Sequence, residues 1–272
     1  MIEVRIFLSV GSCVDPGLNR SGFDQAAQRA LASVARPVIF PDMKTPLLRF
    51  LFASLVLGCL APAAVAAEEG KWISLFDGKT LNGWKQLQAQ AKFAVEDGAI
   101  VGRVTEGVTR NSFLVTEQEF GDFIFECEFK AAPGINSGVQ FRSQPENEKV
   151  KHVHGYQYEI DPNPRALTGG LYEEGRRGWF APTKNNGEPQ QAWAAANASK
   201  FKDGEWNTMR IEARGNHIRT WLNGHLMTDW VDKDEDVRIK RGFFGLQVHS
   251  TTRPEAFGRP IAFRNLRVMK LD

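Results

Sequence analysis

Cysteine is scarce in this sequence, which excludes a fold held together by disulfides. The chain has three cysteines, Cys13, Cys59 and Cys127. The N-terminal pattern described below predicts cleavage near Ala66, after which Cys127 stands alone and no internal disulfide can form. Stability must then come from a hydrophobic core, and roughly 200 residues are enough to form one in a single domain.

The sequence also lacks a strong charge of either sign. It has 34 Lys and Arg residues against 32 Asp and Glu residues, and six of the basic and four of the acidic ones precede residue 67. The remainder is therefore formally neutral, with 28 of each kind. A neutral domain does not have the excess positive charge with which proteins bind nucleic-acid phosphates, so we expect no nucleic-acid partner.

No apolar run is long enough to cross a bilayer comfortably, so we expect no membrane span. The apolar run at residues 50–60 is short, follows a basic stretch at residues 43–49 and precedes the small residues 64–66. This is the pattern of a signal peptide with its cleavage site, which predicts a periplasmic or secreted protein. The alternative is an N-terminal domain followed by one membrane anchor.

The predicted signal peptide divides the chain into three parts. Residues 43–66 form the signal peptide, with Met43 as the start, and residues 67–272 form a single domain. Residues 1–42 are then a disordered extension from a misassigned start codon, because a signal peptide works only when it emerges first. Residues 56–59 also resemble a bacterial lipobox, which would make Cys59 a lipidated N-terminus.

The domain is expected to be all-β, because nearly every periodic segment after residue 71 alternates with a period of two. In residues 123–130, apolar side chains alternate with mostly charged ones, which makes Cys127 a small core residue. Asn223-Gly224 predicts a type I′ hairpin turn, since both residues tolerate positive φ. Several short strands with many Phe and Trp side chains indicate a β-sandwich or jelly roll of antiparallel sheets.

Residues 169–202 do not show this alternation. The segment is rich in Gly, Pro, Asn and Ala and is too long for a tight turn. Long ordered loops in compact domains are often functional, so we expect this one to border a site. Within it, residues 190–200 predict a short helix.

Three predicted strands carry an unusual row of polar side chains on one face. These rows are Gln140 and Arg142; Gln157, Glu159 and Asp161; and Gln247 and His249. The simpler interpretation is a solvated sheet face. Solvated faces usually carry Lys, Glu and Thr, however, whereas these rows carry planar hydrogen-bonding groups that match pairs of sugar hydroxyls. Tyr172, Trp179 or Phe180 could add the aromatic platform that such a site normally has.

Other chemistries have less support. A divalent ion held by Asp161, His154 or His249 is an alternative. His152 and His154 are separated by one residue, a spacing that on a strand could place both on a metal. Surface histidines are commoner than metal sites, however, so we expect no cofactor. The sequence has no nucleophile elbow, phosphate loop or dinucleotide fingerprint.

Residues 71–270 resemble the 3-keto-disaccharide hydrolase domain family. The matching segments are residues 75–84 (LFDGKTLNGW), 136–142, 158–161, 169–173, 204–207, 221–224, 245–249 and 263–266. The resemblance implies a concanavalin A-like jelly-roll β-sandwich, which agrees with the strand pattern. It also implies a carbohydrate substrate.

The family resemblance implies cleavage of glycosides that carry a ketone at sugar carbon 3. The ketone acidifies the proton on carbon 2, so a base can form an enolate, the glycosidic oxygen can leave carbon 1, and water can add back. His249 or Glu159 would be the base, and Asp161 an orienting or acid group. The candidates for substrate binding are Gln140, Arg142, Gln157, Tyr172, Trp179 and Gln247.

Two other functions remain open. Ordinary hydrolysis needs two carboxyl groups, and Glu159 and Asp161 would lie about 6.5 to 7 Å apart along a strand. Laminarinase-type enzymes have a Glu-x-Asp-x-x-Glu run, however, and no third acid follows Asp161 here. The alternative from another class is a non-catalytic, lectin-like sugar-binding module. A structural surface module would predict that Arg142, Glu159 and His249 do not converge.

Overall fold

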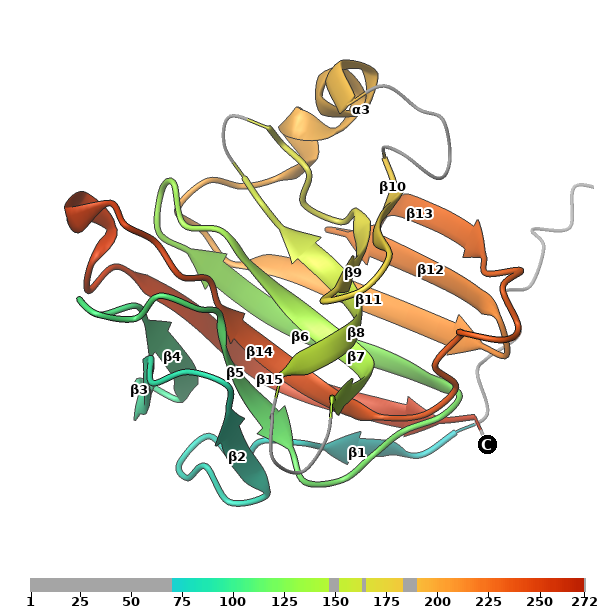
Figure 1. The fold of residues 1–272 in the computed structure, drawn as a ribbon, viewed down its shortest axis with the longest axis horizontal. Coiled ribbons are helices and arrows are strands. Elements are labelled where there is room, and N and C mark those ends of the chain that lie inside the picture. The colour runs from blue at the N-terminus through green and yellow to red at the C-terminus, as the bar shows by residue number, and fades with distance from the viewer. Residues whose placement is uncertain (1–69, 147–151, 163–164, 183–189, 272) are drawn as a thin grey trace, which may run out of the picture. The chain divides into compact units, whose positions relative to one another are not determined.

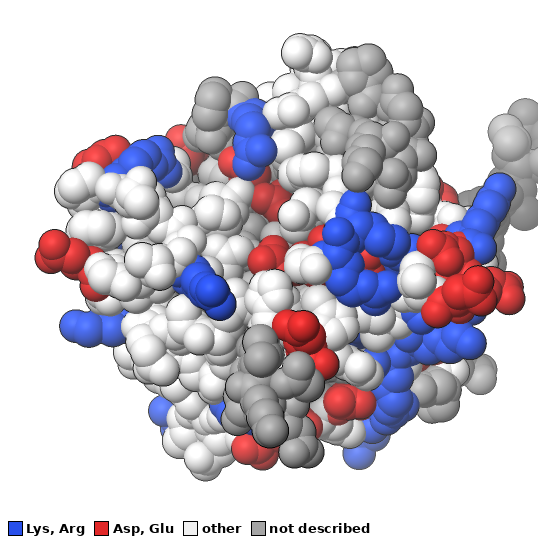
Figure 2. All heavy atoms as spheres, viewed as in Figure 1, with Lys and Arg blue, Asp and Glu red and all other residues white. Residues whose placement is uncertain are grey.

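The computed structural model describes residues 70–146, 152–162, 165–182 and 190–271. The predicted extension at residues 1–42, the signal peptide at residues 43–66 and the lipidation of Cys59 lie outside the described residues. None of the helices within the described ranges has the length and apolar character needed to cross a membrane. On the face shown in Figure 2, acidic and basic side chains are interspersed, in keeping with the balanced composition.

In the described residues, two antiparallel sheets form a sandwich, with one short α-helix at one end of it (Figure 1). The first sheet contains β1 (Trp72–Ser74), β3 (Lys92–Glu96), β4 (Ala99–Arg103), β6 (Phe123–Ala131), β11 (Asn207–Arg214), β12 (His217–Leu222), β13 (His225–Val231) and β15 (Pro260–Lys270). The second contains β2 (Trp84–Leu87), β5 (Ser112–Thr116), β7 (Ser137–Pro145), β8 (Val153–Ile160), β9 (Leu171–Glu174), β10 (Gly178–Ala181) and β14 (Phe243–Val248). The predicted jelly-roll β-sandwich is confirmed.

Aromatic side chains from both sheets fill the space between them. On β6, Phe123 and Phe125 are fully buried and contact Phe244 of β14, with ring centroids 4.7 and 4.5 Å apart. Cys127 lies on the same face of β6 and is also buried, which confirms the predicted core position. Because the inner faces carry these apolar side chains, alternation sends the polar residues of each strand to the outer faces.

The turn between β12 and β13 is the predicted hairpin. Asn223 and Gly224 have φ angles of 50° and 80°, and two consecutive positive values are what a type I′ turn requires. The Asn223 side chain accepts a hydrogen bond from the Thr208 backbone N–H at 2.9 Å and donates one to the Lys200 carbonyl at 2.7 Å. The turn therefore also holds together the elements that flank it.

The prediction of one long loop at residues 169–202 is wrong in its first part. This part contains β9 and β10, two four-residue strands that extend the second sheet beyond β8. Strands this short, set between glycines, are hard to detect from alternation. The predicted helix is confirmed as α3 (Gln190–Asn197), followed by the 3-10 turn η2 (Ala198–Lys200). Trp193 of α3 is buried against the core.

Candidate functional site

A polar pocket of about 230 Å³ lies on the outer face of the second sheet. Side chains from β8, β9, β10 and β14 and from adjoining loops line it. They are Asn111, Asn136, Gln157, Glu159, Arg165, Tyr172, Glu174, Trp179, Gln247 and His249. Six of these ten were predicted as site residues, so the structure brings most of the predicted set together.

Hydrogen-bonded amides form the floor of the polar pocket. Gln140 and Gln247 each donate to the Gln157 carbonyl oxygen, at 2.5 and 3.1 Å, and Gln157 in turn donates to Glu159 Oε2 at 2.8 Å. Gln140 is fully buried and supports Gln157 from below instead of lining the pocket. Gly138 makes room for this arrangement, since a Cβ there would lie 2.5 Å from Gln157 Cδ.

Glu159 is the buried carboxyl group of the polar pocket. Burial raises its pKa to about 7, although hydrogen bonds from Asn136 and Gln157 favour the charged form and nearby Asp161 opposes it. The bond from Asn136 Nδ2 to Glu159 Oε1 is 2.7 Å long. A carboxyl group with this pKa exchanges protons readily near neutral pH, which suits a general base or acid.

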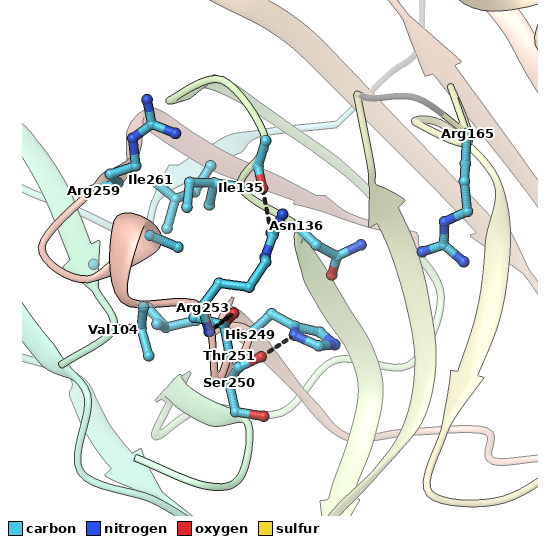
Figure 3. A pocket seen from close by; sticks show the side chains of 14 residues that line it. Val104, Ile135, Asn136, Arg165, His249, Ser250, Thr251, Arg253, Arg259 and Ile261 are labelled. Atoms are coloured by element: carbon cyan, nitrogen blue, oxygen red, sulfur yellow. Dashed lines mark hydrogen bonds between the residues drawn. The ribbon is translucent and has the colours of Figure 1, made fainter. Parts of the chain in front are cut away.

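His249 stands at the exposed rim, directly after β14. Its Nδ1 lies 2.6 Å from the Ser250 carbonyl oxygen, so in the neutral ring Nδ1 carries the proton and Nε2 is the acceptor. Asn111 holds the adjoining loop by accepting a hydrogen bond from the Ser250 N–H at 3.1 Å. Figure 3 shows Asn136, Arg165 and His249 pointing toward a common space.

Asp161 lies next to the polar pocket but does not line it. The side chain is buried beyond the end of β8 and forms an ion pair with Arg165, which does line the pocket. Burial raises the pKa of Asp161, and Arg165 opposes this shift. Asp161 therefore positions the Arg165 guanidinium, and this geometry fits the orienting role in its prediction better than the acid role.

The prediction that Arg142 shares the polar face with Gln140 is wrong. Arg142 has a φ of 45°, and the pairing of β7 with β8 shifts register between Phe141 and Gln144. This bulge reverses the expected alternation. The guanidinium is buried and donates to the carbonyls of Gly121 and Gly215, at 2.7 and 2.6 Å, so it ties β7 to the other sheet.

Tyr172 and Trp179 supply the aromatic wall of the pocket, as predicted. They are paired across β9 and β10, and their ring centroids are 5.2 Å apart in an edge-to-face arrangement. Phe180, the third aromatic candidate, instead points into the core against Tyr156 and Trp230. An aromatic wall beside planar amide and guanidinium groups is the composition expected of a sugar site.

Sequence patterns missed four of the lining residues, namely Asn111, Asn136, Arg165 and Glu174. Glu174 accepts a hydrogen bond from Asn111 at 3.2 Å, and burial raises its pKa. Asn136 and Glu174 could have been found from the family resemblance. Asn136 begins the matching segment 136–142, and Glu174 directly follows the matching segment 169–173. Asn111 and Arg165 lie in loops, where alternation carries no information.

The metal ligands considered from the sequence do not meet in one place. His154 lies near the start of β8 and Asp161 beyond its end, about 23 Å away along the strand. In the described ranges, no cluster of three or more His, Cys, Asp or Glu side chains could hold a metal ion.

Comparison with known proteins identifies the family. The model of the 3-keto-alpha-glucoside-1,2-lyase-like domain matches residues 71–269. The chain belongs to this family. The resemblance inferred from the motifs is therefore confirmed.

The following individual proteins resemble the chain only distantly in sequence. A Bacteroides thetaiotaomicron protein named 3-keto-disaccharide hydrolase is 26% identical over an alignment of 248 residues, and the match covers 74% of this chain and 79% of that protein. A Parabacteroides distasonis structure, provisionally assigned as a glycosyl hydrolase, is 22% identical with a TM-score of 0.49 and covers 75% of this chain and 95% of its own. A Bacillus subtilis carbohydrate-binding module is 18% identical with a TM-score of 0.47, and the match covers 69% and 96% of the two chains. Family membership and the curated relative together support a carbohydrate-active role.

Proposed function

We propose that the protein is an exported enzyme that cleaves 3-keto-glycosides by eliminating the aglycone and then adding water. The observation that carries this proposal is Glu159, a buried carboxyl group with a pKa of about 7 on the floor of the polar pocket. The family and the name of the curated relative support the same chemistry. Export rests on the signal-peptide pattern at residues 43–66.

The oxidised sugar ring would occupy the polar pocket. Its apolar face would pack on Trp179 and Tyr172, while the amides of Gln157 and Gln247 would contact its hydroxyl groups. Arg165 is the charged donor at this site, and Asp161 holds it in place. Arg165 therefore takes the substrate-binding role that the sequence suggested for Arg142, as the partner of the enolate oxygen.

In the first half of the reaction, the ionised Glu159 removes the proton from carbon 2. The electron pair of that bond forms an enolate with the carbon 3 oxygen, which Arg165 and Asn136 can stabilise by donating hydrogen bonds. The bond from carbon 1 to the glycosidic oxygen then breaks, leaving a carbon 1–carbon 2 double bond conjugated with the ketone. Protonated His249 gives its proton to the departing oxygen.

The second half reverses the proton transfers. Neutral His249 accepts a proton through Nε2 from a water molecule that adds to carbon 1, and Glu159 returns a proton to carbon 2. The products are the free 3-keto sugar and the aglycone alcohol, and both residues recover their starting protonation states. Because Glu159 must begin ionised, kcat/KM is expected to fall as the pH drops below about 7.

A comparison of substrates tests the proposal. The wild-type protein is expected to turn over 3-keto-glycosides but not the unoxidised parent glycosides. Glu159→Gln keeps the size of the side chain and removes the base, so it should lower kcat/KM by a factor of about 10³. Glu126→Gln is the matched control, because Glu126 lies on the outer face of the other sheet and should leave activity unchanged.

Two results would contradict the proposal. Binding of sugars without turnover of either series would indicate a lectin-like module. Equal turnover of oxidised and unoxidised glycosides would indicate ordinary hydrolysis, for which the ketone is unnecessary.

A further inference from the structure

A second cavity of about 210 Å³ adjoins the polar pocket, and we call it the arginine cavity (Figure 3). The two share three lining residues, Asn136, Arg165 and His249. Apolar side chains form much of its wall, namely Val104, Ile135, Val248, Ala256 and Ile261. Arg253 and Arg259, from the connection between β14 and β15, complete its lining.

The arginine cavity and the polar pocket differ in charge. Glu159 and Glu174 line the polar pocket, whereas no Asp or Glu is among the described residues that line the arginine cavity. Arg165 is already paired with Asp161. The two remaining arginines give the cavity an excess of positive charge.

Backbone carbonyls hold these two arginines without neutralising them. Arg253 donates to the Gly134 carbonyl at 3.0 Å and Arg259 to the Pro133 carbonyl at 2.8 Å. Neither forms an ion pair with a carboxylate of the described part of the chain. Figure 3 shows the Arg253 side chain crossing the cavity toward Ile135 and Asn136. Guanidinium groups fixed in this way can still bind an anion by further N–H groups.

The size and lining of the arginine cavity fit one ring. A dry cavity of about 150 Å³ in another protein holds a benzene molecule, so this slightly larger one can hold a substituted six-membered ring. Its walls offer mainly methyl and methylene groups and few of the amides that line the polar pocket. An apolar ring with a negative substituent therefore suits it better than a second sugar.

Building on the proposed function, we propose that the arginine cavity is the leaving-group subsite and selects aromatic aglycones that carry a carboxylate. His249 lines both cavities, so the glycosidic oxygen that it protonates would lie at their junction. The keto sugar then occupies the polar pocket and the aglycone ring the arginine cavity. Arg253 and Arg259 bind the carboxylate of that ring.

The test compares two 3-keto-glucosides that differ in aglycone charge, one with a 4-carboxyphenyl and one with a 4-carboxamidophenyl group. The wild type should prefer the carboxylate. In the double variant Arg253→Gln, Arg259→Gln, the ratio of kcat/KM for carboxylate over carboxamide should fall about five- to tenfold. The fall should lie mainly in KM, because the contact with the charge is the same in ground and transition states.

Arg267→Gln is the matched control, since Arg267 is an exposed arginine on the outer face of the first sheet and should leave the ratio unchanged. Added salt should weaken the preference of the wild type. An unchanged ratio in the double variant, or a wild type that prefers the carboxamide, would overturn the proposal.

Binding of the unoxidised 4-carboxyphenyl glucoside gives a readout that does not depend on turnover. If the wild type cleaves neither keto substrate, the proposed function fails, and the subsite is judged from this affinity alone. Weaker binding to the double variant than to the wild type would support the subsite. Equal binding to both proteins would overturn it.

Discussion

The two sheets of the sandwich use charge in opposite ways on their outer faces. On the first sheet, Glu126 pairs with Arg210 and Arg267, and Glu128 pairs with Arg264, all on partly exposed surface. On the second sheet, Glu159 is buried and contacts the neutral amides of Asn136 and Gln157.

The pKa values follow this difference. Burial opposes the ionisation of Glu128, but hydrogen bonds from Asn265 and Arg264 outweigh it and lower its pKa. Burial of Glu159 prevails and raises its pKa to about 7. Two glutamates on outer-facing strand positions thus acquire opposite properties, and the nature of their neighbours decides which becomes reactive. Proteins accept the cost of such a buried carboxyl group where it serves chemistry.

The largest expected effect is on the free energy of unfolding, and it compares the loss of a mostly buried arginine with the loss of an exposed one. Arg177, in the turn between β9 and β10, pairs with Glu173 and Asp232, whose side chains are 0% and 3% exposed. Arg177→Met would leave Asp232 buried without its cation and Glu173 paired only with Arg176, at 3.5 Å. We expect a loss of about 3 to 5 kcal/mol in the free energy of unfolding, measured by urea denaturation at pH 7.

Arg267→Met is the counterpart on the first sheet. The Arg267 side chain is 51% exposed, so solvent screens its ion pair with Glu126, and the expected loss is about 1 kcal/mol or less. Equal losses for the two variants would contradict the contrast between the sheets.

A smaller effect concerns the pH dependence of stability in Glu159→Gln. Between pH 4.5, the usual pKa, and about 7, the folded protein keeps a proton on Glu159 that the unfolded chain has lost. Stability of the wild type therefore falls as the pH rises through this window. The Gln variant avoids this cost, so its advantage in unfolding free energy should grow to at most about 3 kcal/mol at pH 8.

Glu128→Gln should show the reverse sign. Glu128 has a lowered pKa, so its stabilising contribution is present above pH 4.5 and is lost as the pH falls through the folded pKa. The variant should be less stable than the wild type at pH 7, and the difference should shrink in acid. Thermal unfolding across pH 3 to 8 measures both variants, and parallel curves for the two would refute the opposite pKa shifts.

The strand framework could be predicted from the sequence because it rests on local patterns. Alternation placed Phe123, Phe125 and Cys127 in the core, and Asn223-Gly224 fixed a hairpin by its tolerance of positive φ. The same alternation misplaced Arg142, because a bulge with positive φ at a non-glycine residue leaves no clear trace in the sequence.

Strand alternation could predict only those site residues that lie on the strands. Gln157, Glu159 and Gln247 follow from strand alternation. Arg165 and Asn111 reach the pocket from loops, and their positions depend on tertiary contacts such as the ion pair with Asp161 and the hydrogen bond from Ser250. The pKa of Glu159 likewise depends on burial, which a local pattern does not reveal.

The most direct test of the central claim is the position of solvent hydrogen in the product. Wild-type protein would cleave a 3-keto-glycoside in D₂O, with the released 3-keto sugar incubated under the same conditions without protein as a control for spontaneous exchange. Elimination followed by hydration through Glu159 predicts one deuterium at carbon 2 of the released sugar, above the level of the control. A product that keeps its original hydrogen at carbon 2, from a substrate that is cleaved no more slowly when this position carries deuterium, would contradict the account, because the glycosidic bond would then have broken without removal of that proton.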